Sequence, residues 1–274
     1  MPALAVIPPG AITSGRCATP TGAVFMKAVT PQHAWVLEAE MVGLAALAAA
    51  QAVRVPRVLG FDADQDGARL ALEWIDCAPQ TPRSEALLGE QLAMQHRVLA
   101  PSFGWQQNNT IGRCLQLNEP SGDWVRFVRE RRLRPQLELA VQAGLGGALA
   151  ARGGQLLEII DALFATYRPV PSLLHGDLWS GNRLSDASGR PVIFDPAVYF
   201  GDREADIAMT RLFGGFSSAF YAAYVASWPL DPAHGTRCTL YNLYHVLNHA
   251  NLFGAGYAAQ AQGMIDRLLA ELGH

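Results

Sequence analysis

The chain has 274 residues, of which 50% are hydrophobic and 16% are charged, a balance that excludes a disordered protein and favours a compact fold with a substantial core. The net charge of −3 and isoelectric point near 6.2 leave no basic footprint for nucleic acid or an anionic membrane surface. The four cysteines are scattered without CxxC spacing, which disfavours a zinc site or a disulfide framework, so we expect a reducing cytoplasm.

The first 75 or so residues mix strand and helix signals. Residues 22–29, GAVFMKAV, are small and β-branched and predict a strand. Residues 34–50 place three leucines and a methionine at helical spacing, and residues 53–61 and 68–75 predict two more strands. The expected order is strand, helix, strand, strand, and the short N-terminus leaves room for no more than an abbreviated strand before them.

After a proline-containing connector at residues 76–82 the chain becomes mostly helical. A β-rich island at 171–202 interrupts the helices, with predicted strands in SLL (172–174) and PVIF (191–194) and a turn between them at Asp186 to Arg190. The expected helices span 84–100, 123–150, 155–167, 203–211, 217–227, 237–253 and 257–271.

These patterns predict an α+β protein of two lobes, with a small β-rich N-lobe that holds one helix (1–77) and a larger, mainly helical C-lobe (78–274). Residues 212–230 carry no charge and are long enough to be weighed as a membrane span. Two glycines, three serines and Pro229 make this segment weakly hydrophobic, so we expect a buried helix and no membrane association.

The stretch HGDLWSGN holds the residues that suggest chemistry. Asp177 and Asn182 are separated by four residues, and Asp195 directly follows a predicted strand. Phosphoryl transfer from ATP needs metal ions on the phosphates and a carboxylate that accepts the proton of the acceptor hydroxyl. The spacing matches the H-x-D-x₄-N catalytic loop of kinases followed by a DFG-like aspartate, so we expect Asp177 to be the base and Asn182 and Asp195 to bind Mg²⁺.

Lys27 is the single lysine of the chain, whereas the other 20 basic side chains are arginine. Kinases place a lysine on an N-lobe strand, where it contacts the α/β phosphates and a glutamate on the following helix. A compact ammonium suits this place better than a planar guanidinium does. Of the two candidate partners we favour Glu40 over Glu38, which points to a different helix face.

A series of motifs runs in order over about 15–256: GAVFMKAV, EAEMVGLAAL, RVPRVL, LGEQLAMQHR, NNTIG, DWVRFVRERRLRPQLELA, LLHGDLWSGN, VIFDPAVYFGDREADIAMTRLFGGF and LYNLYHVLNHANLFG. In these motifs the chain resembles the fructosamine kinase (ketosamine 3-kinase) family, a branch of the aminoglycoside phosphotransferase-like small-molecule kinases. The resemblance implies a bilobal protein-kinase-like fold, ATP and Mg²⁺ as cofactors, and phosphorylation of the 3-hydroxyl of a ketosamine, which repairs glycated amines.

The segment before Lys27 departs from the kinase pattern, since it has Gly10, Gly15 and Gly22 but no G-x-G-x-x-G. We expect a short turn around Gly15 to bind the phosphates through backbone N–H groups. Cys17 lies nearby and is either a redox handle or, more simply, an inert thiol.

Residues 73–77, EWIDC, should form the hinge between the lobes. Main-chain groups of Glu73 and Ile75 are expected to bind adenine.

Four further residues are candidates for supporting roles. His175 is expected to orient the catalytic loop by hydrogen bonding. Asp206 either accepts backbone N–H bonds from that loop or acts as a favourable charge at a helix start. Trp179 is expected to form a platform for the acceptor sugar. The sequence pattern alone predicts that His249 is a core histidine. The resemblance implies instead that His249 belongs to the acceptor pocket.

Two other functions remain as alternatives. An aminoglycoside or choline-type phosphotransferase would bind a cationic acceptor and needs several carboxylates, yet residues 215–274 offer Asp231, Asp266 and Glu271 alone. A non-catalytic nucleotide-binding protein would explain the weak glycine pattern. The sequence leaves open the sugar length, whether the acceptor is free or protein-bound, and whether the chain forms a homodimer.

Overall fold

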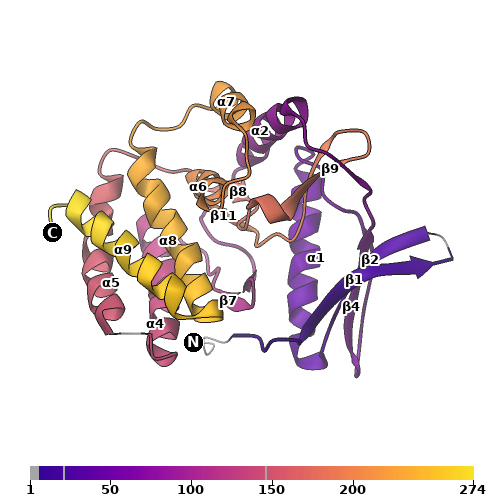
Figure 1. The fold of residues 1–274 in the computed structure, drawn as a ribbon, viewed down its shortest axis with the longest axis horizontal. Helices are drawn as coiled ribbons and strands as arrows, with labels where there is room; N and C mark the ends of the chain where they lie inside the picture. Colours follow the sequence, from indigo (N-terminus) through magenta and orange to yellow (C-terminus); the bar gives the residue numbers. More distant parts are fainter. Residues whose placement is uncertain (1–5, 21, 146) are drawn as a thin grey trace.

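The computed structural model describes residues 6–20, 22–145 and 147–274. Figure 1 shows a smaller lobe, in which a twisted sheet lies beside the long helix α1, and a larger lobe made mostly of helices. The smaller lobe contains a four-stranded antiparallel sheet of order β1-β2-β4-β3. The strands are β1 (Ile12–Thr19), β2 (Gly22–Val29), β3 (Val58–Asp64) and β4 (Gly67–Glu73).

The first strand is longer than expected. The eight residues of β1 pair in register with the eight of β2, so the expectation of an abbreviated first strand is wrong. The segment predicted to form a phosphate-binding turn around Gly15 is this strand, and Gly15 lies opposite Met26 in the middle of it. Pairing with β2 decides this conformation, because exposed polar residues such as those of β1 carry little strand signal of their own.

Helix α1 (Ala34–Ala49) follows a short 3₁₀ turn (Pro31–His33) and covers the sheet. Its leucines at helical spacing, Leu37, Leu44 and Leu47, are buried in one hydrophobic cluster with Leu70 of β4. The same cluster continues into the larger lobe through residues such as Leu88. The packing is therefore continuous across the two lobes, and the boundary at residues 77 and 78 stays a prediction.

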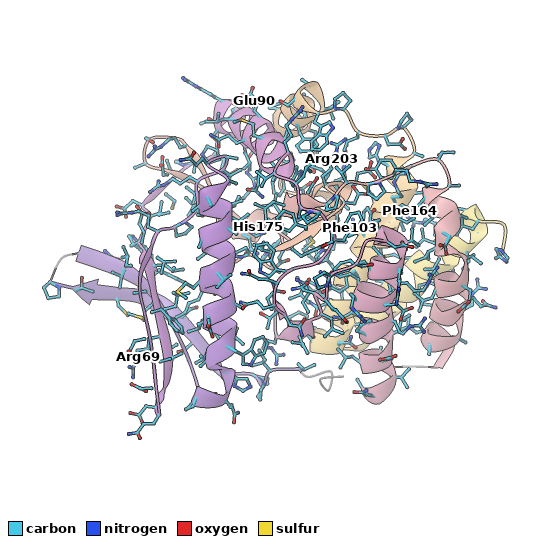
Figure 2. The ribbon with its side chains drawn as sticks, turned by 180° about the vertical axis from the view of Figure 1, so that it is seen from behind. Arg69, Glu90, Phe103, Phe164, His175 and Arg203 are labelled. Atoms are coloured by element: carbon cyan, nitrogen blue, oxygen red, sulfur yellow. The ribbon has the colours of Figure 1, made fainter. Side chains whose placement is uncertain are left out.

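The larger lobe holds most of the helices and three small sheets, ordered β10-β9-β5, β11-β8 and β6-β7. Figure 2 shows side chains filling the space between its helices, with Phe103 and Phe164 among the residues of a second hydrophobic cluster. The helices are α2 (Pro82–His96), α3 (Trp124–Phe127), a π-helical segment (Val128–Leu133), α4 (Arg134–Gln142), α5 (Gly147–Ile159), a 3₁₀ segment (Ile160–Phe164), a 3₁₀ turn (Ser180–Asn182), α6 (Glu204–Leu212), α7 (Ser218–Ser227), α8 (His234–Phe253) and α9 (Ala255–Glu271). The strands are β5 (Cys77–Ala78), β6 (Asn109–Ile111), β7 (Cys114–Gln116), β8 (Ser172–Leu174), β9 (Arg183–Asp186), β10 (Pro191–Ile193) and β11 (Tyr199–Gly201).

The single helix predicted over 123–150 is wrong, because the chain turns after α4. The N–H of Leu145 donates to the C=O of Ala140, the N–H of Gly144 donates to the C=O of Val141, and Gly144 has φ +74. This pair of bonds is a Schellman motif, which ends a helix at a left-handed glycine.

The β-rich island and the uncharged segment also differ from expectation. The turn at Asp186 to Arg190 exists, but it joins β10 to the short polar strand β9, whereas β8 pairs with β11. The helix expected at 217–227 is present as α7 (Ser218–Ser227), but a loop precedes it, so residues 212–230 do not form one buried helix. Within the described part of the chain, no helix has both the length and the apolar character that crossing a membrane requires.

Candidate active site

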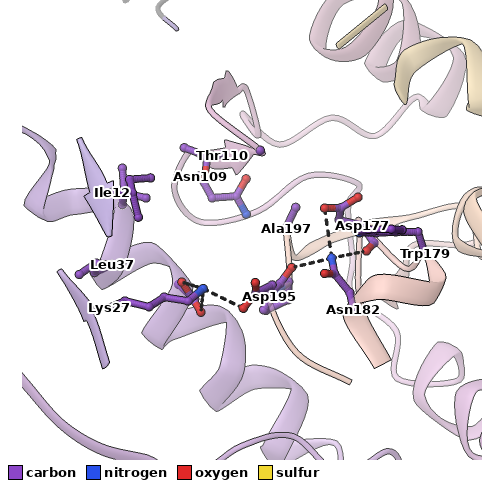
Figure 3. A pocket seen from close by; sticks show the side chains of 14 residues that line it. Ile12, Lys27, Leu37, Asn109, Thr110, Asp177, Trp179, Asn182, Asp195 and Ala197 are labelled. Atoms are coloured by element: carbon purple, nitrogen blue, oxygen red, sulfur yellow. Dashed lines mark hydrogen bonds and ion pairs between the residues drawn. The ribbon is translucent and has the colours of Figure 1, made fainter. Parts of the chain in front are cut away.

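A cavity of about 300 Å³ lies where the two lobes meet. Strand β2 and helix α1 contribute Lys27 and Glu40 to its wall, and the larger lobe contributes Asp177, Asn182 and Asp195. Figure 3 shows Lys27 on one side of this cavity, with Asp195 between it and the pair formed by Asp177 and Asn182. The structure thus brings together the four residues on which the sequence prediction depended.

Lys27 is held by two carboxylates. Its Nζ lies 2.7 and 2.8 Å from the two oxygens of Glu40 and 2.7 Å from Oδ1 of Asp195. Burial alone would lower the pKa of Lys27, but Glu40 and Asp195 outweigh it and raise that pKa, so the ammonium stays charged. The rival partner Glu38 is exposed on α1.

His175 organises the predicted catalytic loop, residues 175–182, from within the protein. Its Nδ1 accepts the backbone N–H of Asp177 at 3.3 Å, so the neutral ring carries its proton on Nε2, which donates to the C=O of Phe194 at 2.9 Å. Burial lowers the pKa of His175 and keeps the ring neutral. Gly176 has φ +83, and a Cβ there would lie 2.1 Å from the carbonyl oxygen of Ala197. Glycine is required at this position.

Asp206, near the start of α6, anchors the same loop. Its oxygens accept the backbone N–H groups of His175 at 2.7 Å and Gly176 at 2.9 Å. His96 of α2 lies 3.2 Å from Asp206 through Nε2 and 2.8 Å from the Tyr224 hydroxyl through Nδ1. Burial raises the pKa of Asp206, but these hydrogen bonds and nearby histidines lower it overall, so the carboxylate is ionised.

His96 and Tyr224 were not among the predicted site residues. Both are buried in the helical lobe, where a histidine in an amphipathic helix carries no functional signal in the sequence. Their part in holding Asp206 follows from contacts between residues more than 100 positions apart.

Asp177 has an environment that tunes its acidity. Asn182 Nδ2 donates to its backbone oxygen at 2.9 Å and to its Oδ2 at 3.2 Å. Burial and the negative charge of Asp195 raise the pKa of Asp177 to about 7, against a smaller lowering by Asn182. A carboxyl group with a pKa near neutrality is suited to accept a proton during catalysis.

Asp195 and Asn182 have oxygens that fit a metal ion. Asn182 uses Nδ2 for its protein partners, so its Oδ1 is left for a ligand, and Asp195 has φ +54 and a side chain that is 44% exposed. In the part of the chain that the structure describes, no three His, Cys, Asp or Glu side chains gather to hold a metal alone. Two protein oxygens suit Mg²⁺, which keeps its waters and binds substrate phosphates as well.

A second, largely apolar cavity of about 260 Å³ shares Asp195 with the first. The predicted hinge residues Glu73 and Ile75 line it, together with residues such as Phe25 and Leu184. The Glu73 carboxylate pairs with the Arg54 guanidinium at 2.8 Å. The backbone N–H of Glu73 donates to the C=O of Arg57 at 2.9 Å. Gly15 lines neither of these two cavities, so its position gives no support to the predicted role in phosphate binding.

An aromatic surface adjoins Asp177. We call it the aromatic ledge, and it consists of Trp179, Phe213, His249, Phe253 and Tyr257. Trp179 meets Phe213 edge-on with ring centroids 6.0 Å apart. The centroid of the His249 ring lies 5.1 to 5.5 Å from those of Phe213, Phe253 and Tyr257. Trp179, Phe213 and Phe253 are exposed, so the ledge offers flat apolar faces to a ligand next to the catalytic loop.

Part of the wall of the first cavity comes from the β6–β7 hairpin, which supplies Asn109, Thr110 and Gly112. This hairpin was not predicted, since its strands have three residues each. Hydrogen bonds from Asn109 Nδ2 to Val198 O (2.8 Å) and from Gln116 Nε2 to Ala197 O (3.0 Å) attach it to the segment after Asp195.

The comparisons of sequence point to one family. The sequence profile described as fructosamine kinase matches residues 5–271. A probable ketoamine kinase of Synechocystis is 41% identical over 95% of this chain and 88% of its own length. A chloroplastic protein-ribulosamine 3-kinase of Arabidopsis thaliana is 38% identical over 92% of this chain and 77% of its own.

Solved structures agree with this assignment. A crystal structure described as a putative fructosamine-3-kinase from Thermobifida fusca superimposes with a TM-score of 0.86 at 32% identity, covering 98% of this chain and 93% of that one. An aminoglycoside phosphotransferase in complex with ADP and hygromycin B has a TM-score of 0.60 at 15% identity, covering 98% and 94%, which shows a shared fold. The bilobal, protein-kinase-like fold expected from the sequence is confirmed, and the chain belongs to the fructosamine kinase family.

Proposed function

We propose that this protein transfers the γ-phosphoryl group of ATP to the 3-hydroxyl of a ketosamine, such as a ribulosamine, erythrulosamine or fructosamine adduct, in the deglycation of amines. The observation that carries the proposal is the convergence of Lys27, Asp177, Asn182 and Asp195 on one cavity. Relatives named ketoamine kinase and protein-ribulosamine 3-kinase support the acceptor class.

The nucleotide would occupy both cavities. The apolar one beside Glu73 and Ile75 suits adenine. Because the Glu73 N–H already donates to the C=O of Arg57, the carbonyl of Glu73 and the backbone groups of Ile75 would bind the edge of the base. Lys27 would contact the α/β phosphates while Glu40 holds its ammonium in place. Because Asp195 lines both cavities, the phosphates would pass beside it.

Asn182 and Asp195 would hold Mg²⁺ through the oxygens described above. When bound, the ion neutralises phosphate charge as the phosphoryl group is transferred. Asp177 would accept the proton of the acceptor hydroxyl, and its pKa of about 7 matches that role at neutral pH. His175 and Asp206 keep the loop in position without contacting the substrate.

The acceptor side favours a ketosamine over a polycation. Glu40, Asp177 and Asp195 are the carboxylates among the described residues that line the first cavity, and all three have roles toward the nucleotide, the metal or the reacting hydroxyl. The aromatic ledge, with Trp179 and His249, instead provides faces on which a sugar and its amine can pack. The cavity therefore lacks the additional carboxylates that would bind the amino groups of an aminoglycoside.

An acceptor screen tests this function. The purified protein is incubated with Mg·ATP and erythrulosyl-, ribulosyl- or fructosyl-lysine, and the product is located by ³¹P and ¹H NMR. We expect phosphorylation at O3 of at least one of these adducts and no turnover of kanamycin or choline. Phosphorylation of kanamycin alone would favour the aminoglycoside alternative, and ATP binding without any transfer would favour the non-catalytic one.

We further propose that the protein works in a reducing compartment, the cytoplasm. All four cysteines are free thiols, and burial raises the pKa of Cys114 and of Cys238 to about 11. These two thiols are thus poor nucleophiles at neutral pH.

A further inference from the structure

A cavity of about 320 Å³ opens between α6, α8 and α9, three helices of the larger lobe (Figure 1). Its lining shares no residue with the two cavities of the active site. Arg211 at the end of α6 and Arg267 on α9 belong to its walls, as does Asn242 of α8. No aspartate or glutamate is among the residues that line it.

The two arginines lack acidic partners. Among the described residues neither Arg211 nor Arg267 forms an ion pair, whereas Arg237, on the neighbouring part of α8, binds both Glu204 and Asp231. The Arg211 guanidinium lies 4.5 Å from the centre of the Tyr221 ring, which restrains its position. In a chain of net charge −3, two unpaired guanidinium groups on one cavity create a local site for negative charge.

Asn242 adds an amide group to the same cavity, and the residue is 9% exposed. Its Oδ1 is a buried acceptor and cannot bind an anion. Its Nδ2 forms no hydrogen bond with the other described residues, so this N–H donor is left for a ligand. Thr239, one turn earlier on α8, adds a hydroxyl to the same cavity.

We infer that this cavity binds a small oxyanion, either a carboxylate or a phosphate group. Guanidinium, amide N–H and hydroxyl groups are the donors that recognise such groups. The anion has two conceivable sources. It is either a carboxylate on the amine part of the acceptor, an alternative that rests on the proposed function, or a free anion that binds on its own.

The cavity lies near the aromatic ledge, so the anion could belong to the acceptor itself. Arg211 precedes Phe213 of the aromatic ledge by two residues, and Asn242 precedes His249 by seven residues on α8. Seven residues are two helical turns, or about 10 Å along the axis. An amine with a long side chain, such as the lysine of a glycated lysine, could place its α-carboxylate beyond the ledge.

Direct binding tests the site without turnover. Protein saturated with Mg·ADP, which occupies the active site, is titrated with inorganic phosphate and with acetate by isothermal titration calorimetry. We expect saturable binding of at least one of them, weakened roughly tenfold or more in the double variant Arg211→Gln, Arg267→Gln. Arg83→Gln, which changes an exposed arginine without an acidic partner on α2, is the matched control and should bind as the wild type does. Absence of saturable binding, or equal binding by the double variant, would overturn the inference.

Kinetics then separate the two sources. The acceptors compared are ε-ribulosyl-lysine and ribulosyl-cadaverine, which lacks the carboxylate. If the anion belongs to the acceptor, the double variant raises KM for the lysine adduct roughly tenfold and leaves the cadaverine adduct unchanged. If the anion is free, both adducts respond alike. Should neither adduct be phosphorylated at all, the proposed function fails, while the calorimetry still decides whether the cavity binds anions.

Discussion

The β1–β2 hairpin and the catalytic loop at 175–182 both belong to the region around the cleft, yet they are built in different ways. Most side chains of β1 are exposed, and Gly15 has open space where a Cβ would stand. The catalytic loop is tied by Asp206, His175 and Phe194, and Gly176 has no space for a side chain. The loop that carries the proposed base is fixed by contacts with residues distant in the sequence, whereas β1 is held mainly by its pairing with β2.

The largest expected effect concerns the catalytic loop. Asp177→Asn removes the proton acceptor but keeps the shape of the side chain, so we expect kcat to fall by roughly 10²- to 10⁴-fold while ATP binding stays nearly intact. Steady-state kinetics and nucleotide titration measure the two quantities. A variant with wild-type kcat would show that Asp177 is not the base.

The second prediction tests the tightness of the same loop. Gly176→Ala would force a Cβ to within 2.1 Å of the Ala197 carbonyl oxygen at a φ of +83. We expect the free energy of unfolding to fall by about 3 kcal/mol, measured by urea denaturation. A loss of less than about 0.5 kcal/mol in the free energy of unfolding would mean that the loop shifts easily. The loop would then be no more tightly held than the β1–β2 hairpin.

The third prediction uses the raised pKa of Asp177. The folded protein has a pKa of about 7 there, against 3.8 for the free group, so between these values the folded state binds more protons than the unfolded one. Wild-type stability therefore decreases as pH rises from 4 to 7 because of this group. Asp177→Asn removes that cost. The free energy of unfolding of the variant relative to the wild type should therefore rise by about 1–2 kcal/mol between pH 4 and pH 8, a value reduced for screening by water in the cleft.

Urea midpoints of the wild type and of Asp177→Asn at pH 4.5 and pH 8 measure this difference. Comparing the two proteins at each pH cancels the titration of groups that do not interact with Asp177. An identical difference at both pH values would show that Asp177 has an ordinary pKa in the folded protein.

The smallest expected effect lies in the hairpin. Gly15→Ala should change the free energy of unfolding by less than about 0.5 kcal/mol and the KM for ATP by less than about twofold, since Gly15 lies within a regular strand and meets nothing nearby. Gly176→Ala is the matched comparison. A tenfold rise in the KM for ATP would show that the backbone at Gly15 does contact the phosphates, as the sequence alone suggested.

The sequence by itself determined which side chains were expected to meet at the site. The spacing of Asp177, Asn182 and Asp195 and the one lysine in a strand were enough to predict which side chains meet, because strand and helix periodicity orient residues such as Glu40 reliably. The fold class followed from the order of elements and from the resemblance to fructosamine kinases. Short-range patterns were sufficient wherever a residue lies on an element with a clear period.

Only the tertiary structure decided which distant segments complete the site. The pairing of β1 with β2, the support of Asp206 by His96, and the places of Phe213 and the β6–β7 hairpin beside the cleft have no local signal. The physical reason is that these features depend on partners far apart in the chain. The conformation and contacts of such residues depend on the segments that pack against them. This applies to the polar strand β1, to the buried His96 and to the three-residue strands of the β6–β7 hairpin, and the packing forms only when the lobes fold together.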